Sequence, residues 1–148
     1  MAKPAAHAVQ HIHVVPTQQG TAVFLVLEPK TLVIQVDPAV GEALQAAIAG
    51  KPPERPLTHD LMLALLRGLE ASVERVVISD VRDGVFFAKV VLRQSGPAAT
   101  QVAEVDARPS DSLVLAVKAK APVVVLPAVA DACEDMSEAL AKLRGEQG

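Results

Sequence analysis

The N-terminal part of the chain alternates between short apolar runs and turn signals. Residues 9–15, 21–27 and 32–36 are rich in Val, Ile, Leu and Thr, which favour extended strands. A Gln-Gln-Gly sequence separates the first two runs, a Glu-Pro-Lys sequence separates the second from the third, and both sequences favour turns. The pattern predicts an antiparallel meander of three strands.

A helical period replaces this pattern in the next two segments. Between residues 40 and 48 the apolar positions fall at i, i+3, i+4, i+7 and i+8, which predicts the apolar face of a helix that Gly50 ends. In the second segment Thr58 is a good N-cap, and Asp60 lies in the first turn, where a carboxylate favours the helix dipole. One face of this second helix carries Leu61, Leu65 and Leu69, joined by Met62 and Leu66.

The second half of the chain predicts a hairpin and a buried helix. Residues 73–81 and 85–92 flank an Asp-Gly pair, which favours a tight hairpin turn. Pro109 suits the first position of a helix, and residues 113–119 are nearly all apolar, so this helix should be buried on most sides. Short strands are predicted at residues 102–105 and 122–126.

The order of these elements indicates an α+β fold, a single domain with a mixed, largely antiparallel sheet and helices between the strand groups. We assign residues 1–8 to a flexible N-terminus, 9–132 to the domain and 133–148 to a charged C-terminal tail. The strand at residues 21–27 is apolar on both faces. A small domain offers little to cover a second apolar face, so we expect a homo-oligomer.

Composition narrows the classes of function. Hydrophobic residues make up 51% of the chain but aromatic residues only 2%, with no Trp or Tyr, so the stacking platforms of single-strand binders are missing. The net charge of −3 and the pI of about 5.8 give no basic footprint, which argues against extended nucleic-acid binding. A small hydrolytic site in which metal ions supply the positive charge is compatible with this balance.

The cysteine content and the hydropathy of the sequence indicate the cellular compartment of the protein. Cys133 is the one cysteine, so no intramolecular disulfide can form, which fits a reducing environment. No signal-peptide pattern is visible at the start of the sequence, and the longest apolar stretches are too short to span a bilayer. We therefore expect a cytoplasmic protein with no membrane association.

Three short blocks, residues 55–60, 80–84 and 106–111, combine Asp and Arg in a chain that is only 21% charged. They lie at junctions between predicted elements, where functional sites are common. Hydrolysis of a phosphodiester needs carboxylates for a divalent ion, a base for water and a cation for phosphate charge. The candidate catalytic residues are His59, Asp60, Arg82, Asp106, Arg108 and Asp111.

The blocks also suggest individual roles. His59 is the natural base because an imidazole titrates near neutral pH. Forked guanidinium donors suit phosphate, which makes Arg55, Arg82 and Arg108 the candidate substrate-binding residues. Oxygen ligands suit Mg²⁺ or another divalent cation, and the candidate metal ligands are Asp80, Asp106 and Asp111.

Each block also has a purely structural interpretation. Thr58 and Asp60 can simply cap a helix, the Asp-Gly pair can simply form a turn, and Asp106 and Arg108 can pair with each other to fix a loop. His11 and His13 lie two apart on one strand face, but the sequence offers no third metal ligand beside them.

The three blocks resemble the motifs of the bifunctional nuclease domain family. The matching stretches are Arg-Pro-Leu-Thr-His-Asp-Leu at residues 55–61, Asp-Val-Arg-Asp-Gly-Val-Phe-Phe-Ala at 80–88 and Asp-Ala-Arg-Pro-Ser-Asp-Ser at 106–112, and the resemblance spans residues 9–131. Phe87 stands in place of the usual Tyr, and Val40 stands where members often carry a Glu. The resemblance implies nuclease activity on DNA and RNA.

The sequence thus supports one leading hypothesis and two rivals. The leading hypothesis is a metal-assisted nuclease that binds nucleic acid weakly and with little sequence specificity. The first rival is a non-catalytic oligomeric domain that binds a small anionic ligand or a protein partner. The second rival is a purely structural oligomeric module. The acidic pI favours the rivals, and the charged junction blocks favour the enzyme.

Overall fold

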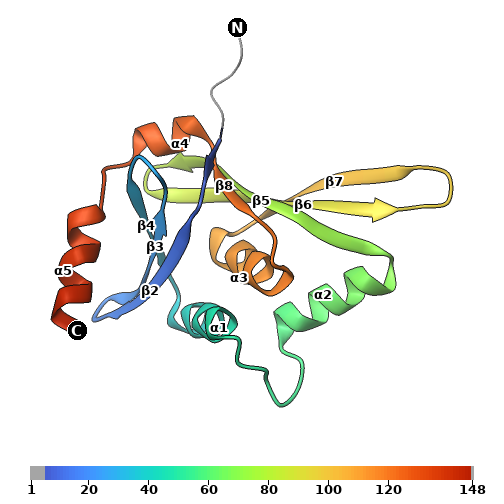
Figure 1. The fold of residues 1–148 in the computed structure, drawn as a ribbon, viewed down its shortest axis with the longest axis horizontal. Coiled ribbons are helices and arrows are strands. Elements are labelled where there is room, and N and C mark those ends of the chain that lie inside the picture. The colour runs from blue at the N-terminus through green and yellow to red at the C-terminus, as the bar shows by residue number, and fades with distance from the viewer. Residues whose placement is uncertain (1–5, 148) are drawn as a thin grey trace, which may run out of the picture.

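The computed structural model describes residues 6–147, which form two sheets and five helices (Figure 1). The larger sheet has the strand order β1 (His7–Ala8), β8 (Val123–Val125), β5 (Ala71–Arg82), β6 (Val85–Ser95) and β7 (Thr100–Ala107). The smaller sheet has the order β2 (His11–Thr17), β3 (Gly20–Val26) and β4 (Thr31–Val36). The helices are α1 (Pro38–Ala49), α2 (Thr58–Gly68), α3 (Pro109–Ala119), α4 (Pro127–Ala132) and α5 (Ser137–Gln147).

The predicted α+β fold is confirmed. The meander β2–β3–β4 is antiparallel, as the alternating runs and turns predict. In the larger sheet β5 pairs antiparallel with β6 and parallel with β8, so this sheet is mixed. Figure 1 shows α1, α2 and α3 on one side of the larger sheet, which leaves its other face without these helices.

The long hairpin β5–β6 turns at the predicted Asp-Gly pair. Asp83 has a φ of 51° and Gly84 a φ of 79°. Positive φ at both central residues is what a tight hairpin turn of this kind requires, and Asp and Gly tolerate it at low cost. This turn lies at the same end of the sheet as the start of α3, because Ala88 near the turn pairs with Ala107 at the end of β7.

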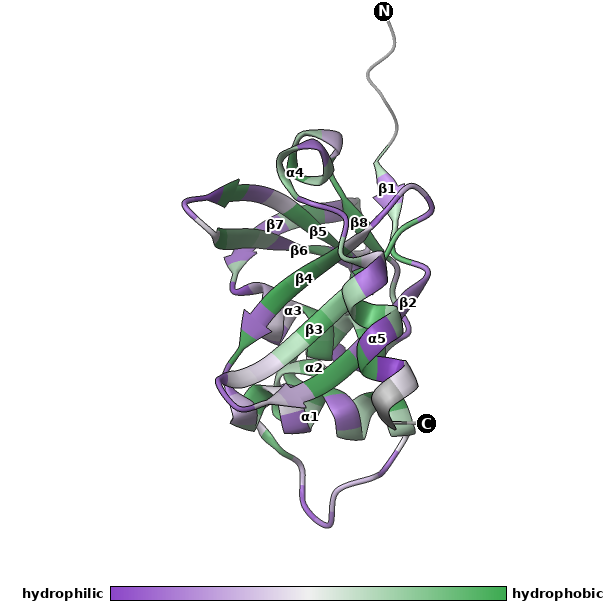
Figure 2. Cartoon of the chain, turned by 90° about the vertical axis from the view of Figure 1, so that its left-hand side faces the viewer, coloured by the Kyte–Doolittle hydropathy of each residue, from purple (hydrophilic) through white to green (hydrophobic). Residues whose placement is uncertain are grey.

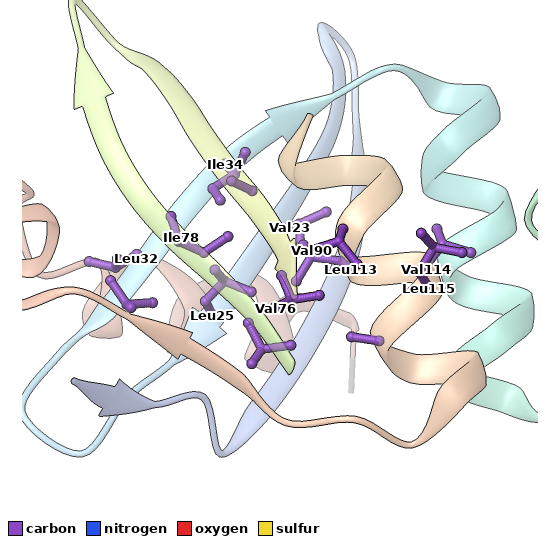
Figure 3. Close-up of a cluster of buried hydrophobic side chains, with 14 of the residues drawn as sticks. Val23, Leu25, Leu32, Ile34, Val76, Ile78, Val90, Leu113, Val114 and Leu115 are labelled. Carbon is purple, nitrogen blue, oxygen red and sulfur yellow. The ribbon is translucent and has the colours of Figure 1, made fainter. Parts of the chain in front are cut away.

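The core forms where α3 packs between the sheets (Figure 3). Leu113 and Val114 are fully buried, and their neighbours in the core include Val23 and Leu25 of β3 and Ile78 of β5. The near-continuous apolar run in α3 therefore packs on several sides, as the sequence predicts. Because α3 is fixed this firmly, the residues at its N-terminus have a well-defined position.

The strand β3 is covered on both faces by the chain itself. One face joins the main core, and the other packs Ala22 and Phe24 against Leu140 of α5. Residues 133–148, expected as a charged tail, thus contain a helix that covers the smaller sheet, and Figures 1 and 2 show α5 beside β3. The apolar strand at residues 21–27 therefore gives no reason to expect self-association.

The helices of residues 6–147 include none that is both long and apolar enough to cross a membrane.

Candidate functional site

Two helices begin side by side at one hollow of the surface. Each helix follows an extended residue, Asp37 before α1 and Arg108 before α3, and each has a proline in its first turn. Both of these residues line a hollow of about 380 Å³. The first backbone N–H groups of a helix have no partner within the helix and carry partial positive charge. The start of α3 therefore favours an anion in this hollow, whereas the carboxylate of Asp37 in the lining opposes one.

The walls of this hollow come from three parts of the chain. Residues 33–37 of β4 and the following cap form one wall, and residues 84–86 at the β5–β6 turn form another. The third wall is the start of α3, where Ser110 is 8% exposed. The turn of the second charged block and the helix start of the third block thus meet at one place.

Asp111 joins the first charged block to the third. Its Oδ1 lies 3.0 Å from His59 Nε2. Its Oδ2 accepts a hydrogen bond of 2.9 Å from Arg108 Nε and lies 2.9 Å from Arg108 Nη2 in an ion pair. Because an ionised carboxylate can only accept, His59 Nε2 carries the proton in this contact. His59 is buried on α2, whereas the Arg108 side chain is 64% exposed. The three side chains form a continuous path from the core to the hollow.

The environment keeps Asp111 ionised. Burial opposes ionisation and raises the pKa of the carboxyl, but the hydrogen bonds from His59 and Arg108, with the charge of Arg108, outweigh it. The net effect holds the pKa of Asp111 below its usual value. At neutral pH the site therefore contains a fixed negative charge that orients one imidazole and one guanidinium.

Asp60 has a structural position beside this path. Its Oδ1 accepts a hydrogen bond of 2.8 Å from Lys118 of α3, and its Oδ2 accepts one of 3.0 Å from the Leu57 backbone N–H. These two bonds, that of Lys118 first, hold the pKa of Asp60 below its usual value. Asp60 therefore fixes the start of α2 on α3, one residue from His59. Thr58, expected as the N-cap, is the first residue of the helix.

The strand register places Asp106 on the other face of the larger sheet. Buried Ala88 and Val90 of β6 face the helices, so Lys89 between them points away. Lys89 pairs across the strands with Asp106, and cross-strand partners share a face. Asp106 therefore points away from Asp111, although only five positions separate them in the sequence.

Asp80 and Arg82 also belong to this outer face. Asp80 pairs with Phe87 in the register, and its Oδ2 accepts a 2.7 Å hydrogen bond from Arg82 Nε. The Arg82 guanidinium lies 5.6 Å from the centre of the Phe87 ring, within the range of a cation–π contact. Arg55 is exposed in the loop before α2. Asp80, Arg82 and Asp106 thus share the outer face, whereas the Arg108 guanidinium bonds Asp111 at the start of α3.

The comparison with family models matches the bifunctional nuclease domain over residues 23–137. This match covers most of the chain and includes all three charged blocks. The chain belongs to the bifunctional nuclease domain family.

Two relatives of this bifunctional nuclease domain come from strains of Mycobacterium tuberculosis. They are the uncharacterized protein MT1877 of strain CDC 1551 / Oshkosh and the uncharacterized protein Rv1829 of strain ATCC 25618 / H37Rv. Each is 37% identical over 94 residues, a match that covers 61% of this chain and 53% of the relative. The match thus spans about half the length of either relative.

The expected metal ligands of this bifunctional nuclease domain do not fit a shared Mg²⁺ ion. Both oxygens of Asp111 accept hydrogen bonds, and Asp80 accepts from Arg82 and from the Val81 backbone N–H. Asp106 lies on the opposite face of the sheet from Asp111. Over residues 6–147, no three His, Cys, Asp or Glu side chains are close enough together to hold a metal ion.

Sequence reasoning missed Asp37, whose Oδ2 lies 3.9 Å from Arg108 Nη1. A signal was present, because Asp-Pro precedes α1 just as Arg-Pro precedes α3. It also missed Lys118, which lies in the last turn of α3 and holds Asp60. A lysine near a helix C-terminus has an ordinary explanation in the helix dipole, so nothing in the sequence marks its second role.

Proposed function

We propose that this chain binds phosphate groups of nucleic acid at the hollow beside Arg108 and hydrolyses phosphodiester bonds there, weakly and with little sequence specificity. The observation that carries the proposal is that the N-terminus of α3 and one exposed guanidinium, that of Arg108, meet at that hollow. Membership of the bifunctional nuclease domain family supports phosphodiesters as the substrate class.

The proposal gives each residue a separate role. Arg108 binds a phosphate oxygen through its exposed donors, and the backbone N–H groups at the start of α3 add to this attraction. Asp111 holds both Arg108 and His59 in place. His59 is the candidate base, positioned by Asp111 in the way that carboxylates commonly orient catalytic imidazoles. Asp60 positions the start of the helix that carries His59.

A divalent ion has a different place in this proposal from the one expected from the sequence. The three aspartates expected to hold it do not form a cage, so we do not assign Mg²⁺ to them. Mg²⁺ often binds through substrate phosphates with only one or two protein carboxylates. Activity measured with and without a chelator decides whether such an ion takes part.

The experiment compares two matched arginines. Arg108→Gln removes a guanidinium at the hollow, and Arg82→Gln removes one that is 75% exposed on the outer face and also pairs with an Asp. The Arg108→Gln variant should cleave a fluorescent single-stranded oligonucleotide at least about tenfold more slowly than wild type, because a hydrogen bond to a charged group is lost. The Arg82→Gln variant should keep wild-type activity.

The assay is run with Mg²⁺, with Mn²⁺ and with a chelator, on protein whose activity follows the protein peak through two columns. Equal activity of the two variants would mean that the hollow is not the site. Activity that Arg108→Gln and Asp111→Ala both leave unchanged would point to a contaminating nuclease.

One observation favours a second candidate function, the binding of an anionic ligand without catalysis. His59 is only 9% exposed and its Nε2 is already bonded, which restricts its access to a substrate. In that case wild-type protein cleaves no oligonucleotide with any metal. It still binds pyrophosphate or a short oligonucleotide in calorimetry, and Arg108→Gln weakens that binding by about tenfold or more whereas Arg82→Gln does not.

A further inference from the structure

The helix α2 has two apolar faces, and only one of them is covered by the chain. His59, Leu63 and Leu66 face inward, where the two leucines pack on the main core. On the other side the leucine ridge, defined as Leu57, Leu61, Leu65 and Leu69, repeats every fourth position. Its members are 53%, 53%, 60% and 65% exposed, and the neighbouring Met62 is 40% exposed.

The leucine ridge differs from ordinary exposed apolar residues because it is contiguous. Single exposed leucines are common on protein surfaces, whereas a continuous apolar patch of several hundred Å² marks an interaction site. Positions four apart on a helix are neighbours, so Leu61 and Leu65 lie side by side. Leu57 and Leu69, the caps of α2, flank them at either end of the helix. No charged residue interrupts this row, since each of its positions is leucine.

We propose that the leucine ridge is the interface through which two copies of this chain form a dimer. Rows of side chains four apart pack into the matching grooves of a second helix. Consider an antiparallel pair of α2 helices whose two-fold axis crosses the ridge midway between Leu61 and Leu65. This pair sets Leu61 against Leu65 of the other copy and Leu57 against Leu69. Such an interface uses the same patch on both copies, so each leucine meets a leucine.

The apolar area of the leucine ridge is large enough for an interface with a second copy of the chain. A leucine that is more than half exposed offers on the order of 100 Å² of apolar surface, so the ridge with Met62 offers roughly 500 Å². The apolar share of a homodimer interface is about 65%, so this area corresponds to a patch of roughly 800 Å². About 800 Å² per partner is the standard size of a stable protein interface.

The leucine ridge and the hollow beside Arg108 use different residues. None of the residues that line the hollow beside Arg108 belongs to the ridge. The inference therefore stands apart from the proposed function, and loss of dimerisation need not abolish activity.

The test measures molar mass by sedimentation equilibrium between about 1 and 100 μM. Wild-type protein should sediment as a dimer, twice the chain mass of 15.5 kDa. The double variant Leu61→Glu, Leu65→Glu should sediment as a monomer, with a dissociation constant raised more than about 100-fold, because two central apolar contacts are replaced by charge. Both substituted positions already face solvent, so its circular dichroism should match that of wild type.

A matched control introduces the same charges elsewhere. Val85 and Phe87 are 58% and 37% exposed at the turn end of the β5–β6 hairpin. Leu69 of the ridge is bonded by Gln94 at the other end of that hairpin. The double variant Val85→Glu, Phe87→Glu should remain a dimer. A dimer that this control disrupts, or that the ridge variant retains, would overturn the assignment of the interface.

A second measurement tests the orientation in a Cys133→Ser background. Protein carrying Leu57→Cys mixed with protein carrying Leu69→Cys should form a mixed disulfide faster than either protein alone forms a symmetric one. Faster formation of the symmetric disulfides than of the mixed disulfide would contradict the antiparallel arrangement. Wild-type protein that stays monomeric at 100 μM overturns the proposal, and if that monomer floats with phosphatidylglycerol vesicles the ridge binds lipid instead.

Discussion

Replacing Asp111 by alanine should destabilise the fold by about 2 kcal/mol at neutral pH. The change removes the acceptor for His59 Nε2, whose side chain is only 11% exposed, and leaves a buried donor without a partner at a cost of about 1–3 kcal/mol. The Arg108 guanidinium also loses its acceptor but is 64% exposed and regains water, which costs little. The His59 contact therefore dominates the expected loss.

The measurement is urea unfolding at pH 7, followed by circular dichroism. With a slope of about 2 kcal/mol per molar urea, a loss of about 2 kcal/mol lowers the midpoint by about 1 M. Asp106→Ala is the matched control, because that aspartate is exposed on the outer face of the larger sheet, and its midpoint should correspond to a change within about 0.5 kcal/mol.

The pH dependence of the stability difference between wild type and Asp111→Ala tests whether the charge of Asp111 causes the loss. The pKa of Asp111 is lower in the folded protein than in the unfolded chain, so its contribution to stability is present above the unfolded value of about 3.9. That contribution is lost as the pH falls through the lower folded value. The gap between wild type and Asp111→Ala should therefore narrow below about pH 4.

A gap at pH 7 of less than about 0.5 kcal/mol would show that Asp111 does not hold His59 as described. A gap that stays the same size at pH 3 would show that the loss comes from the packing of the side chain and not from its charge.

Three further substitutions test how the layers pack, each by urea unfolding. Gly41→Ala should cost about 1–3 kcal/mol, because the added Cβ lies 2.7 Å from Cγ2 of the buried Thr21. Gly68→Ala meets no atom within 4 Å and should be neutral or stabilising by up to about 1 kcal/mol, so equal effects at the two glycines would contradict the α1–β3 contact. Leu140→Ala should cost about 2–5 kcal/mol, since this α5 side chain is 6% exposed and packs against Ala22 and Phe24 of β3. No loss would mean that α5 does not cover the smaller sheet in solution.

The local part of the fold was predictable because its signals lie close together in the sequence. The three-strand meander, the Asp-Gly turn and the proline at the start of α3 each depend on a few neighbouring residues. The cover over β3 was not predictable in this way, because α5 carries a weak apolar pattern among many charges. Only the partner surface, with Phe24 on β3, gives Leu140 its buried position.

The candidate site was predictable in part, and the register of the larger sheet explains the limit. The third charged block begins at the end of β7 and continues into α3, so the side chains of Asp106 and Asp111 point in different directions. The contact between His59 and Asp111 joins residues 52 positions apart. It forms because α2 docks on α3 through Lys118 and Asp60 as well as through apolar packing. Charge clustering in a sequence marks such blocks but does not say which members share a face.

The apolar periodicity of α2 predicts the helix correctly but does not say which of its faces packs on the core. The spacing of Leu61, Leu65 and Leu69 predicts a helix with one covered face, and the helix is present. The structure covers the opposite side, with His59 and Leu63, and turns the leucines to solvent. Hydrophobic spacing indicates that one face of a helix is buried. The same spacing is found whether that face is buried in the protein core or in an interface between chains. A periodic leucine face that the chain leaves bare is therefore a signal for a second molecule.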